Sequence, residues 1–321
     1  MTFASSKTQI ADPMPGTNPA DKVVDALRQH HREHPGDHCY LVIDPSLRIL
    51  EDRPDDGVFF SRMTAHPVPI EHGAFPSEHR PKLLEIDLSD PLGVALLREA
   101  VRIAFADRNP AELARGHGQR VGGWLFSGAP IDDIVAHWSA VLLQRDERGQ
   151  QRVLRFYDSR ALSLMWPVLD AQQQRTLLGP VQAWFALDAS ANLVTYTAKG
   201  AMQPRLDLSD DQWRVLHRQS HVNRALSLFM HDVDRQPSES EVAAAQVAAA
   251  RADYLGLSDR DDIVKFVGYA LSWHPKFYEH PVVDAAFKAL AKDALHCAVV
   301  DEFDAGLIDD VQSGRWLKQT A

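Results

Sequence analysis

The amino-acid sequence predicts an α/β N-terminal lobe, with a mostly parallel, helix-covered sheet, followed by an all-α helical C-terminal lobe. Two observations predict this class. From Asp21 to about Thr197, short apolar runs alternate with segments of helical periodicity, and this alternation is typical of βαβ units that form a parallel sheet. Beyond Lys199-Gly200 there is no strand signal, and only helices with clear caps follow.

Three segments are expected along the chain. Residues 1–20 include three prolines and a glycine within a short polar stretch, which predicts a disordered leader. Residues 21–203 are expected to form the α/β domain and residues 204–321 the helical lobe. The boundary is placed in the stretch from Lys199 to Pro204, where the strand signal ends.

Six runs of residues are expected to form strands. Cys39–Ile43 is continuously apolar, as expected of a strand covered on both faces. The others are Leu83–Ile86, Val121–Phe126, Val153–Tyr157, Gln182–Leu187 and an edge strand over Leu193–Thr197. The region Pro45–Arg80 is rich in Pro, His, Asp and Gly and is expected to be mostly loop.

Helix starts are indicated by capping residues and by proline at a first helical position. In the first lobe, the expected starts are Asp21, Pro91, Ile131 and Ser159. In the second lobe, the expected starts are Ser209, Ser238 with Glu241 as a capping box, Ser258 with Asp261, and Pro281. On the helix after Ser238, the residues Ala243, Val247, Ala250 and Tyr254 share a face, which predicts close helix packing there.

Composition restricts the class of protein. An apolar fraction of 45% and a charged fraction of 24% are typical of a globular protein, and no apolar run reaches the roughly 18 residues that span a bilayer. The net charge of −10 argues against nucleic-acid binding. The N-terminus lacks the features of a secretory signal. One interpretation of Cys39 and Cys297 is a disulfide; the favoured interpretation is two buried, unpaired thiols in a reducing cytoplasm.

Motifs for catalysis and for metal binding are weak. The sequence has no G-x-S-x-G elbow and no phosphate-binding loop. The glycine cluster Gly116, Gly118 and Gly122 precedes a strand instead of following one, which indicates a flexible turn. Two histidine groups, one around His30 and His34 and one at His217 and His221, lack the ligand set of a zinc site and are expected to be exposed or capping residues.

The segment RVLRFYDSRAL is the most distinctive in the chain. One interpretation is a pocket in which Arg155 and Arg160 hold an anion and Asp158 acts as a base. The favoured interpretation is structural: Asp158 caps the helix that begins at Ser159, and the two arginines pair with it. Trp213 and Trp273 in the helical lobe are candidate interface residues, because aromatic anchors are enriched in interfaces.

Three segments carry a resemblance to a known family: CYLVIDPSLRILED, GGWLFSGAPIDDIVAHWSAVLLQRD, and RVLRFYDSRAL with LLGPVQAWF. The chain resembles the bacterial type VI secretion effector-chaperone (adaptor) family. The third segment is similar to the family's Phe-Arg-Phe-Tyr-Asp-Pro-Arg block followed by Gly-Pro and an aromatic strand. Leu154 stands in the first Phe position of this block, and Ser159 stands in the Pro position.

The resemblance implies a non-catalytic cytoplasmic adaptor of a Gram-negative bacterium that binds a toxic effector and the valine–glycine-repeat spike protein, VgrG. No catalytic residue, metal or cofactor is expected, and neither nucleic acid nor a membrane span is expected. The alternatives are a hydrolase-type enzyme with a pocket at Arg155, Asp158 and Arg160, and a protein that neutralises a toxin by binding it. The candidate partner-binding or signature residues are Arg155, Phe156, Tyr157, Asp158, Arg160, Gly179, Pro180, Trp213 and Trp273.

Overall fold

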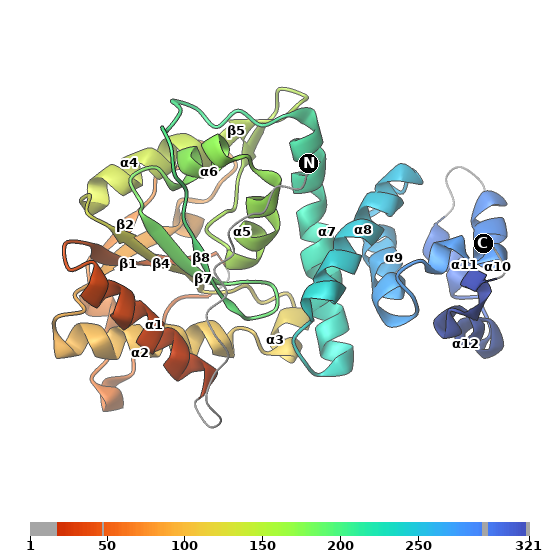
Figure 1. Cartoon of the computed structure of the whole chain (residues 1–321), viewed down its shortest axis with the longest axis horizontal. Coiled ribbons are helices and arrows are strands. Elements are labelled where there is room, and N and C mark those ends of the chain that lie inside the picture. The colour runs from red at the N-terminus through yellow and green to blue at the C-terminus, as the bar shows by residue number, and fades with distance from the viewer. Residues whose placement is uncertain (1–17, 47, 291–294, 319–321) are drawn as a thin grey trace. The chain divides into compact units, whose positions relative to one another are not determined.

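The computed structural model describes residues 18–46, 48–290 and 295–318, and it contains a six-stranded sheet followed along the chain by helices (Figure 1). The chain forms two compact units that divide between Arg214 and Val215. The division falls within α7 (Asp210–Val233). Gln212, in the first turn of this helix, donates from its amide to the carbonyl of Val168 at 2.9 Å, so this turn belongs to the first unit. The boundary expected at 203/204 stays a prediction.

The sheet of the first unit is antiparallel throughout, with strand order β2-β3-β1-β4-β7-β8. Its strands are β1 (His38–Ile43), β2 (Ala65–Pro67), β3 (Lys82–Ile86), β4 (Val121–Ser127), β7 (Ala183–Leu187) and β8 (Leu193–Tyr196). A separate hairpin pairs β5 (Leu143–Arg145) with β6 (Gln151–Val153). The predicted edge strand is confirmed as β8, whereas β2 was missed within the region expected to be loop.

The expected parallel sheet is wrong, because each neighbouring pair of strands is antiparallel. β3 and β4 do run in the same direction, and the chain between them includes α2 (Pro91–Ala106), as in a βαβ unit. However, β1 lies between these two strands and pairs antiparallel with both. The succession of β3, α2 and β4 was therefore read correctly, but it does not reveal that an earlier strand inserts between β3 and β4.

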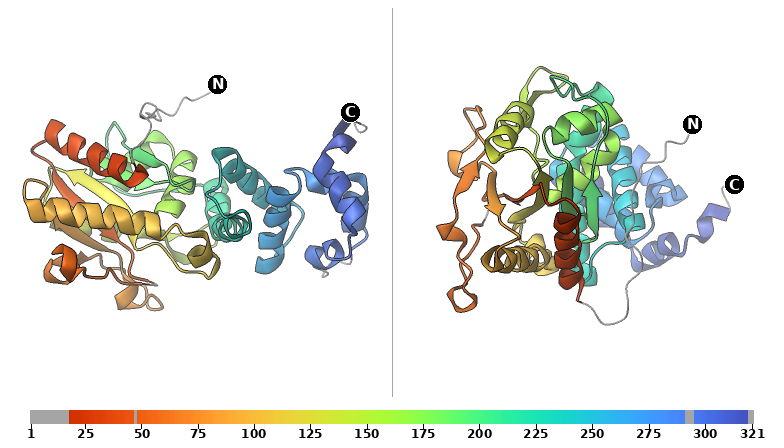
Figure 2. Two further views of the ribbon diagram at one scale, coloured as in Figure 1. Left: turned by 90° about the horizontal axis from the view of Figure 1, so that it is seen from below. Right: turned by 60° about the vertical axis from the view of Figure 1, so that its left-hand side comes forward.

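Helices cover both faces of the sheet (Figures 1 and 2). α1 (Pro19–Glu33) and α2 pack side by side on one face, over a core that includes Leu41, Trp124 and Phe185. α4 (Ile131–Leu142), α5 (Ser159–Met165) and α6 (Ala171–Leu178) belong to the other side, where the rings of Trp138 and Trp184 lie 5.1 Å apart. The short α3 (Pro110–Ala114) follows α2.

The first helix begins earlier than the sequence predicted. The side chain of Asn18 accepts a hydrogen bond from the backbone of Ala20, and Pro19 occupies the first turn. Asn18 is therefore the cap that was assigned to Asp21. Of the leader predicted over residues 1–20, Pro19 and Ala20 are helical, and residues 1–17 lie outside the described residues.

The strand predicted over Val153–Tyr157 is also wrong. β6 ends at Val153, and the N–H of Leu154 donates to the carbonyl of Leu142. The chain then turns, because the N–H of Asp158 donates to the carbonyl of Arg155 at 3.0 Å. Phe156 and Tyr157 are fully buried within this turn, so the apolar run that resembled a strand is a buried turn.

The second unit is helical, as predicted. After α7 it contains α8 (Glu239–Tyr254), α9 (Arg260–Ser272), α10 (Pro281–Lys288), α11 (His296–Val300) and α12 (Ala305–Ser313). The capping box of Ser238 and Glu241 is confirmed. The predicted packing face of α8 is wrong: Val247 and Tyr254 are 59% and 80% exposed, and the opposite alanines are buried, since α8 packs on α9 through that side.

Both cysteines are buried and unpaired, Cys39 in β1 and Cys297 in α11. Among the described residues, no helix is both long enough and apolar enough to cross a bilayer.

Gly123 provides a test of the packing between β4 and β7. Its φ of +131° is unfavourable for other residues, and a Cβ there would lie 2.4 Å from the carbonyl oxygen of Phe185. We expect Gly123→Ala to lower the free energy of unfolding by roughly 2–4 kcal/mol through backbone strain and overpacking. Urea denaturation measures the change. Gly73→Ala is the control, because a Cβ at Gly73 meets no atom within 4 Å; equal losses in both variants would contradict the packing described here.

Candidate interaction site

The turn of residues 154–158 lies directly on the first residues of β4. A Cβ at Gly122 would lie 2.0 Å from the carbonyl oxygen of Tyr157, so the two backbones approach too closely for any side chain at position 122. Gly122 lies within β4, as the strand predicted over Val121–Phe126 implies, and not in the flexible turn indicated by the glycine cluster. The contact with Tyr157 is the reason that glycine is needed at this position. The turn is thereby fixed at the end of the sheet where β4 begins.

Arg155 connects the turn to the chain that leaves β1 at the same end of the sheet. Its Nη2 atom lies 2.6 Å from Oδ2 of the buried Asp44 and 3.2 Å from Oγ of Ser46. The guanidinium also lies over the ring of Tyr157, 5.5 Å from the centroid. Burial lowers the pKa of Arg155, but the charges of Asp44, Tyr157 and Asp158 and the hydrogen bond to Asp44 together raise it by more, so the net shift is upward. The side chain is still 46% exposed, so it is a charged group held in one position at the surface.

Asp158 has the structural role that was favoured from the sequence. Its Oδ1 atom accepts from the backbone N–H of Arg160 at 3.0 Å and caps α5, and its Oδ2 atom lies 3.0 Å from Nη2 of Arg160. Burial alone would raise the pKa of Asp158, but the charge and hydrogen bonds of Arg160, with the charge of Arg155, outweigh burial and lower the pKa to about 2. The expectation that Arg155 also pairs with Asp158 is wrong, because its ion pair is with Asp44.

The two aromatic residues of the turn are core residues. The ring of Phe156 meets the rings of Trp138 and Trp184 edge to face, at 5.1 and 6.2 Å between centroids. Tyr157 is fully buried, and burial raises the pKa of its hydroxyl group. Both rings are buried and cannot contact a partner. Arg155 is the most exposed residue of the turn.

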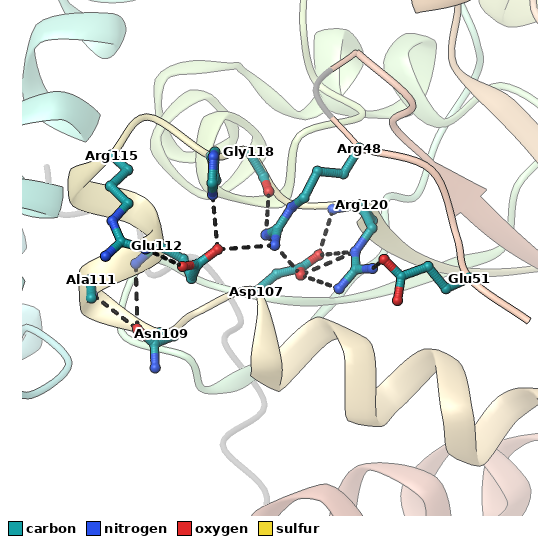
Figure 3. Close-up of polar contacts among 10 residues, drawn as sticks. Arg48, Glu51, Asp107, Asn109, Ala111, Glu112, Arg115, Gly118 and Arg120 are labelled. Carbon is teal, nitrogen blue, oxygen red and sulfur yellow. Dashed lines mark hydrogen bonds and ion pairs between the residues drawn. The ribbon is translucent and has the colours of Figure 1, made fainter. Parts of the chain in front are cut away.

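A buried carboxylate at Asp107, just after α2, organises the neighbouring loop (Figure 3). Asp107 accepts from the backbone N–H of Arg120 at 2.8 Å and from the guanidinium of Arg120 at 2.7–3.1 Å. Nη2 of Arg48 lies 3.0 Å from Oδ1 of Asp107 and also donates to the carbonyl of Gly118. Sequence reasoning did not find this cluster, since its members lie on three separate segments and match no motif.

The cluster extends outward to the surface. Glu112 in α3 accepts from Nη1 of Arg48 at 3.4 Å, and its Oε2 atom lies 2.8 Å from Nδ1 of His117. Next to Arg48, Ile49 is 72% exposed, the second most exposed of the large apolar side chains in the described chain. The carboxylates of Asp44, Asp107, Glu112 and Asp158 are each paired with an arginine. The arrangement suits recognition of another surface better than ligation of a metal ion, because each of these acidic groups already has a cationic partner.

The other predicted residues lie elsewhere. Gly179 ends α6 with a positive φ, and its space is filled by the ring of His137. Pro180 accepts from Oγ of Ser127, the last residue of β4, whereas the turn of residues 154–158 contacts Gly122 near the start of that strand. Five residues of strand separate the two contacts by about 16 Å. The turn of residues 154–158 and the Gly179-Pro180 pair therefore lie toward opposite ends of β4.

The tryptophans and histidines have packing roles. Trp213 is buried, and Trp273 is half-buried and stacks on Tyr269 at 4.6 Å. Their role in an interface stays a prediction. The ring of His30 stacks on that of His34 at 4.2 Å and meets the ring of Phe126 edge to face at 4.5 Å, which accounts for part of the histidine group near the N-terminus.

Comparison with known proteins gives one match. Residues 81–176, less than a third of the chain, match the family described as "Domain of unknown function (DUF4123)". The matched segment begins just before β3, ends within α6, and includes Asp107, Arg120 and the turn from Arg155 to Arg160. No curated protein and no solved structure shows significant similarity.

The low pKa of Asp158 predicts a pH-dependent contribution to stability. Because the pKa is about 2 in the folded protein and about 3.9 when unfolded, the ionised carboxylate stabilises the fold above pH 4. This contribution is lost as the pH falls toward 2. We expect Asp158→Asn, which retains an oxygen for the cap, to lower the free energy of unfolding by roughly 2 kcal/mol at pH 7.

Urea unfolding of this variant and the unmodified protein at pH 7, 4 and 3 measures the effect. The difference between the two should shrink as the pH falls. A difference that is the same at all three values would mean that the charge of Asp158 is not responsible.

Proposed function

We propose that this protein is a non-catalytic type VI secretion adaptor that binds a specific toxic effector and helps to load it onto the VgrG spike protein. The observation that carries the proposal is the match of residues 81–176 to DUF4123, a family associated in general with type VI secretion adaptors. The match contains the turn by which the chain resembles effector chaperones, together with Asp107 and Arg120, which lie close beneath it in the fold.

The charged end of the sheet has the properties of a binding surface. Arg155 is half-exposed yet fixed by Asp44 and Ser46, so little side-chain entropy would be lost when a partner binds. Ile49 lies three residues after Ser46 on the same loop and is strongly exposed. Arginine is enriched in interface hot spots, and Ile49 adds an exposed apolar side chain on the loop that holds Arg155 in place.

The hydrolase alternative has less support. A general base at Asp158 would need a pKa near the working pH, whereas Arg160 lowers the pKa of this group to about 2. The carboxylate also caps α5 and bonds to Arg160, so both of its oxygens are engaged. A toxin-neutralising protein would use the same kind of surface as an adaptor, and it differs in binding the toxin without binding VgrG.

Two partners require two surfaces. We assign the general partner, VgrG, to the sheet-containing lobe, which carries the family match, and the specific effector to the helical lobe, which lies outside that match. Capture of the effector by a chain truncated near Gln203 would contradict this assignment.

Ile49→Asp tests the surface without disturbing the core. We expect at least tenfold weaker binding of VgrG, because a buried carboxylate would replace an apolar contact, and we expect unchanged binding of the effector. Co-purification from cells that co-express this protein with a VgrG protein and a candidate effector, followed by calorimetric titration, measures both interactions.

Leu92→Asp is the matched control. Leu92 is another exposed apolar residue of the same unit, at the opposite end of α2 from Asp107 and about 22 Å away along the helix. Equal affinity of VgrG for both variants would exclude this end of the sheet as its binding surface. Turnover of a substrate by the purified protein, abolished in a folded Asp158→Asn variant, would overturn the proposal as a whole.

A further inference from the structure

At the outer edge of β8, the backbone groups of two residues form no hydrogen bond with any residue that the structure describes. The N–H of Asp188 donates to the carbonyl of Asn192 at 2.9 Å, which identifies these two residues as a hydrogen-bonded pair of the β7–β8 ladder. Because such pairs alternate in an antiparallel ladder, the backbone groups of Leu193 and Thr195 point away from β7. No described residue forms a hydrogen bond with them. The edge therefore presents two donors and two acceptors.

The two edges of the sheet differ in their protection. At β2, Pro67 lies in the strand and Pro69 follows it, and proline removes the N–H group that an added strand would need. At β8 the sequence Leu193-Val194-Thr195-Tyr196 contains neither proline nor charge. Its first three residues are partly exposed. Of the two edges, β8 is the one that is suited to accept another strand.

We propose that the edge of β8 binds an extended segment of VgrG, the partner assigned to this lobe, by strand addition, with the backbone of Leu193 and Thr195 supplying the hydrogen bonds. This inference rests on the proposed adaptor function and specifies how a partner is held. An extended peptide is the chemistry that matches the edge, because its own N–H and C=O groups repeat at the spacing of the strand.

The size of the edge favours a partner over a second copy of this chain. Four residues of strand extend about 13 Å. Pairing of two such edges would bury far less than the roughly 1,000 Å² that a stable specific interface needs. The same few bonds are useful to a partner that is already bound nearby, since the second contact is then intramolecular.

The edge lies next to the proposed binding surface. Leu193 pairs with Leu187, and the carbonyl of Leu187 accepts from Nη2 of Arg108 at 2.7 Å. The same nitrogen lies 3.2 Å from Oγ of Ser159, the first residue of α5 after the turn. A partner seated on the charged end of the sheet would thus be within reach of the first residue of β8.

Thr195→Pro tests the proposal in the full-length protein. It removes the outward N–H of Thr195, while the pairing of β8 with β7 through Val194 and Tyr196 is retained. We expect about tenfold weaker binding of VgrG, the partner assigned to this lobe, and unchanged binding of the effector. Thr195→Val retains the N–H and should bind VgrG as the unmodified protein does. Equal binding by all three proteins would overturn the inference.

Residue-resolved hydrogen–deuterium exchange on the unmodified protein gives a second measurement, which does not depend on how the variant folds. The amides of Leu193 and Thr195 should exchange rapidly in the free monomer and should become protected in the complex. A complex that forms without this protection would overturn strand addition but would leave the adaptor function standing. Protection already present in the free protein, whether monomer or dimer, would assign the edge to this chain itself. Failure of both partners to bind would overturn the function and the inference together.

Discussion

The buried carboxylate of Asp107 is the interaction on which the rest of the candidate site depends. An isolated charge would be very unfavourable at a site that excludes water, so it persists only because Arg120 and Arg48 surround it with donors. These bonds join the end of α2, the start of β4 and the loop after β1. The carbonyl of Arg120 in turn accepts from the N–H of Asp44, which holds Arg155. Removal of both arginines would leave this buried charge without a cationic partner, at a cost of about 3–5 kcal/mol.

Local features of the fold were predictable from the sequence because they depend on neighbouring residues. Cys39–Ile43 was recognised as a strand from its continuous apolar run, and the capping box of Ser238 and Glu241 follows from residues three positions apart. The direction of the strands was not predictable, since it depends on the insertion of β1 between β3 and β4. The prediction of which face of α8 packs inward was also wrong. An alanine-rich helix offers two similar faces, and only tertiary packing selects one of them.

The candidate site was predictable only in part, for the same reason. The capping role of Asp158 follows from its place directly before the helix, and the structure confirms it. The ion pair of Arg155 with Asp44 joins residues 111 positions apart, and no local pattern specifies it. The strand containing Gly122 was predicted, but the need for glycine there was not, because it comes from the carbonyl of Tyr157, which only the folded chain brings near.

The positions of the two cysteines give each unit its own chemical reporter. Cys39 lies within the central sheet and Cys297 within the helical unit, and burial raises the pKa of both thiols. A thiol reagent reacts with the thiolate, so neither sulfur should be modified while its surroundings remain closed. The rates at which the two positions are alkylated would then report separately how often each lobe opens. A molecule that binds and closes only one lobe would slow the alkylation of the cysteine in that lobe and leave the rate at the other cysteine unchanged.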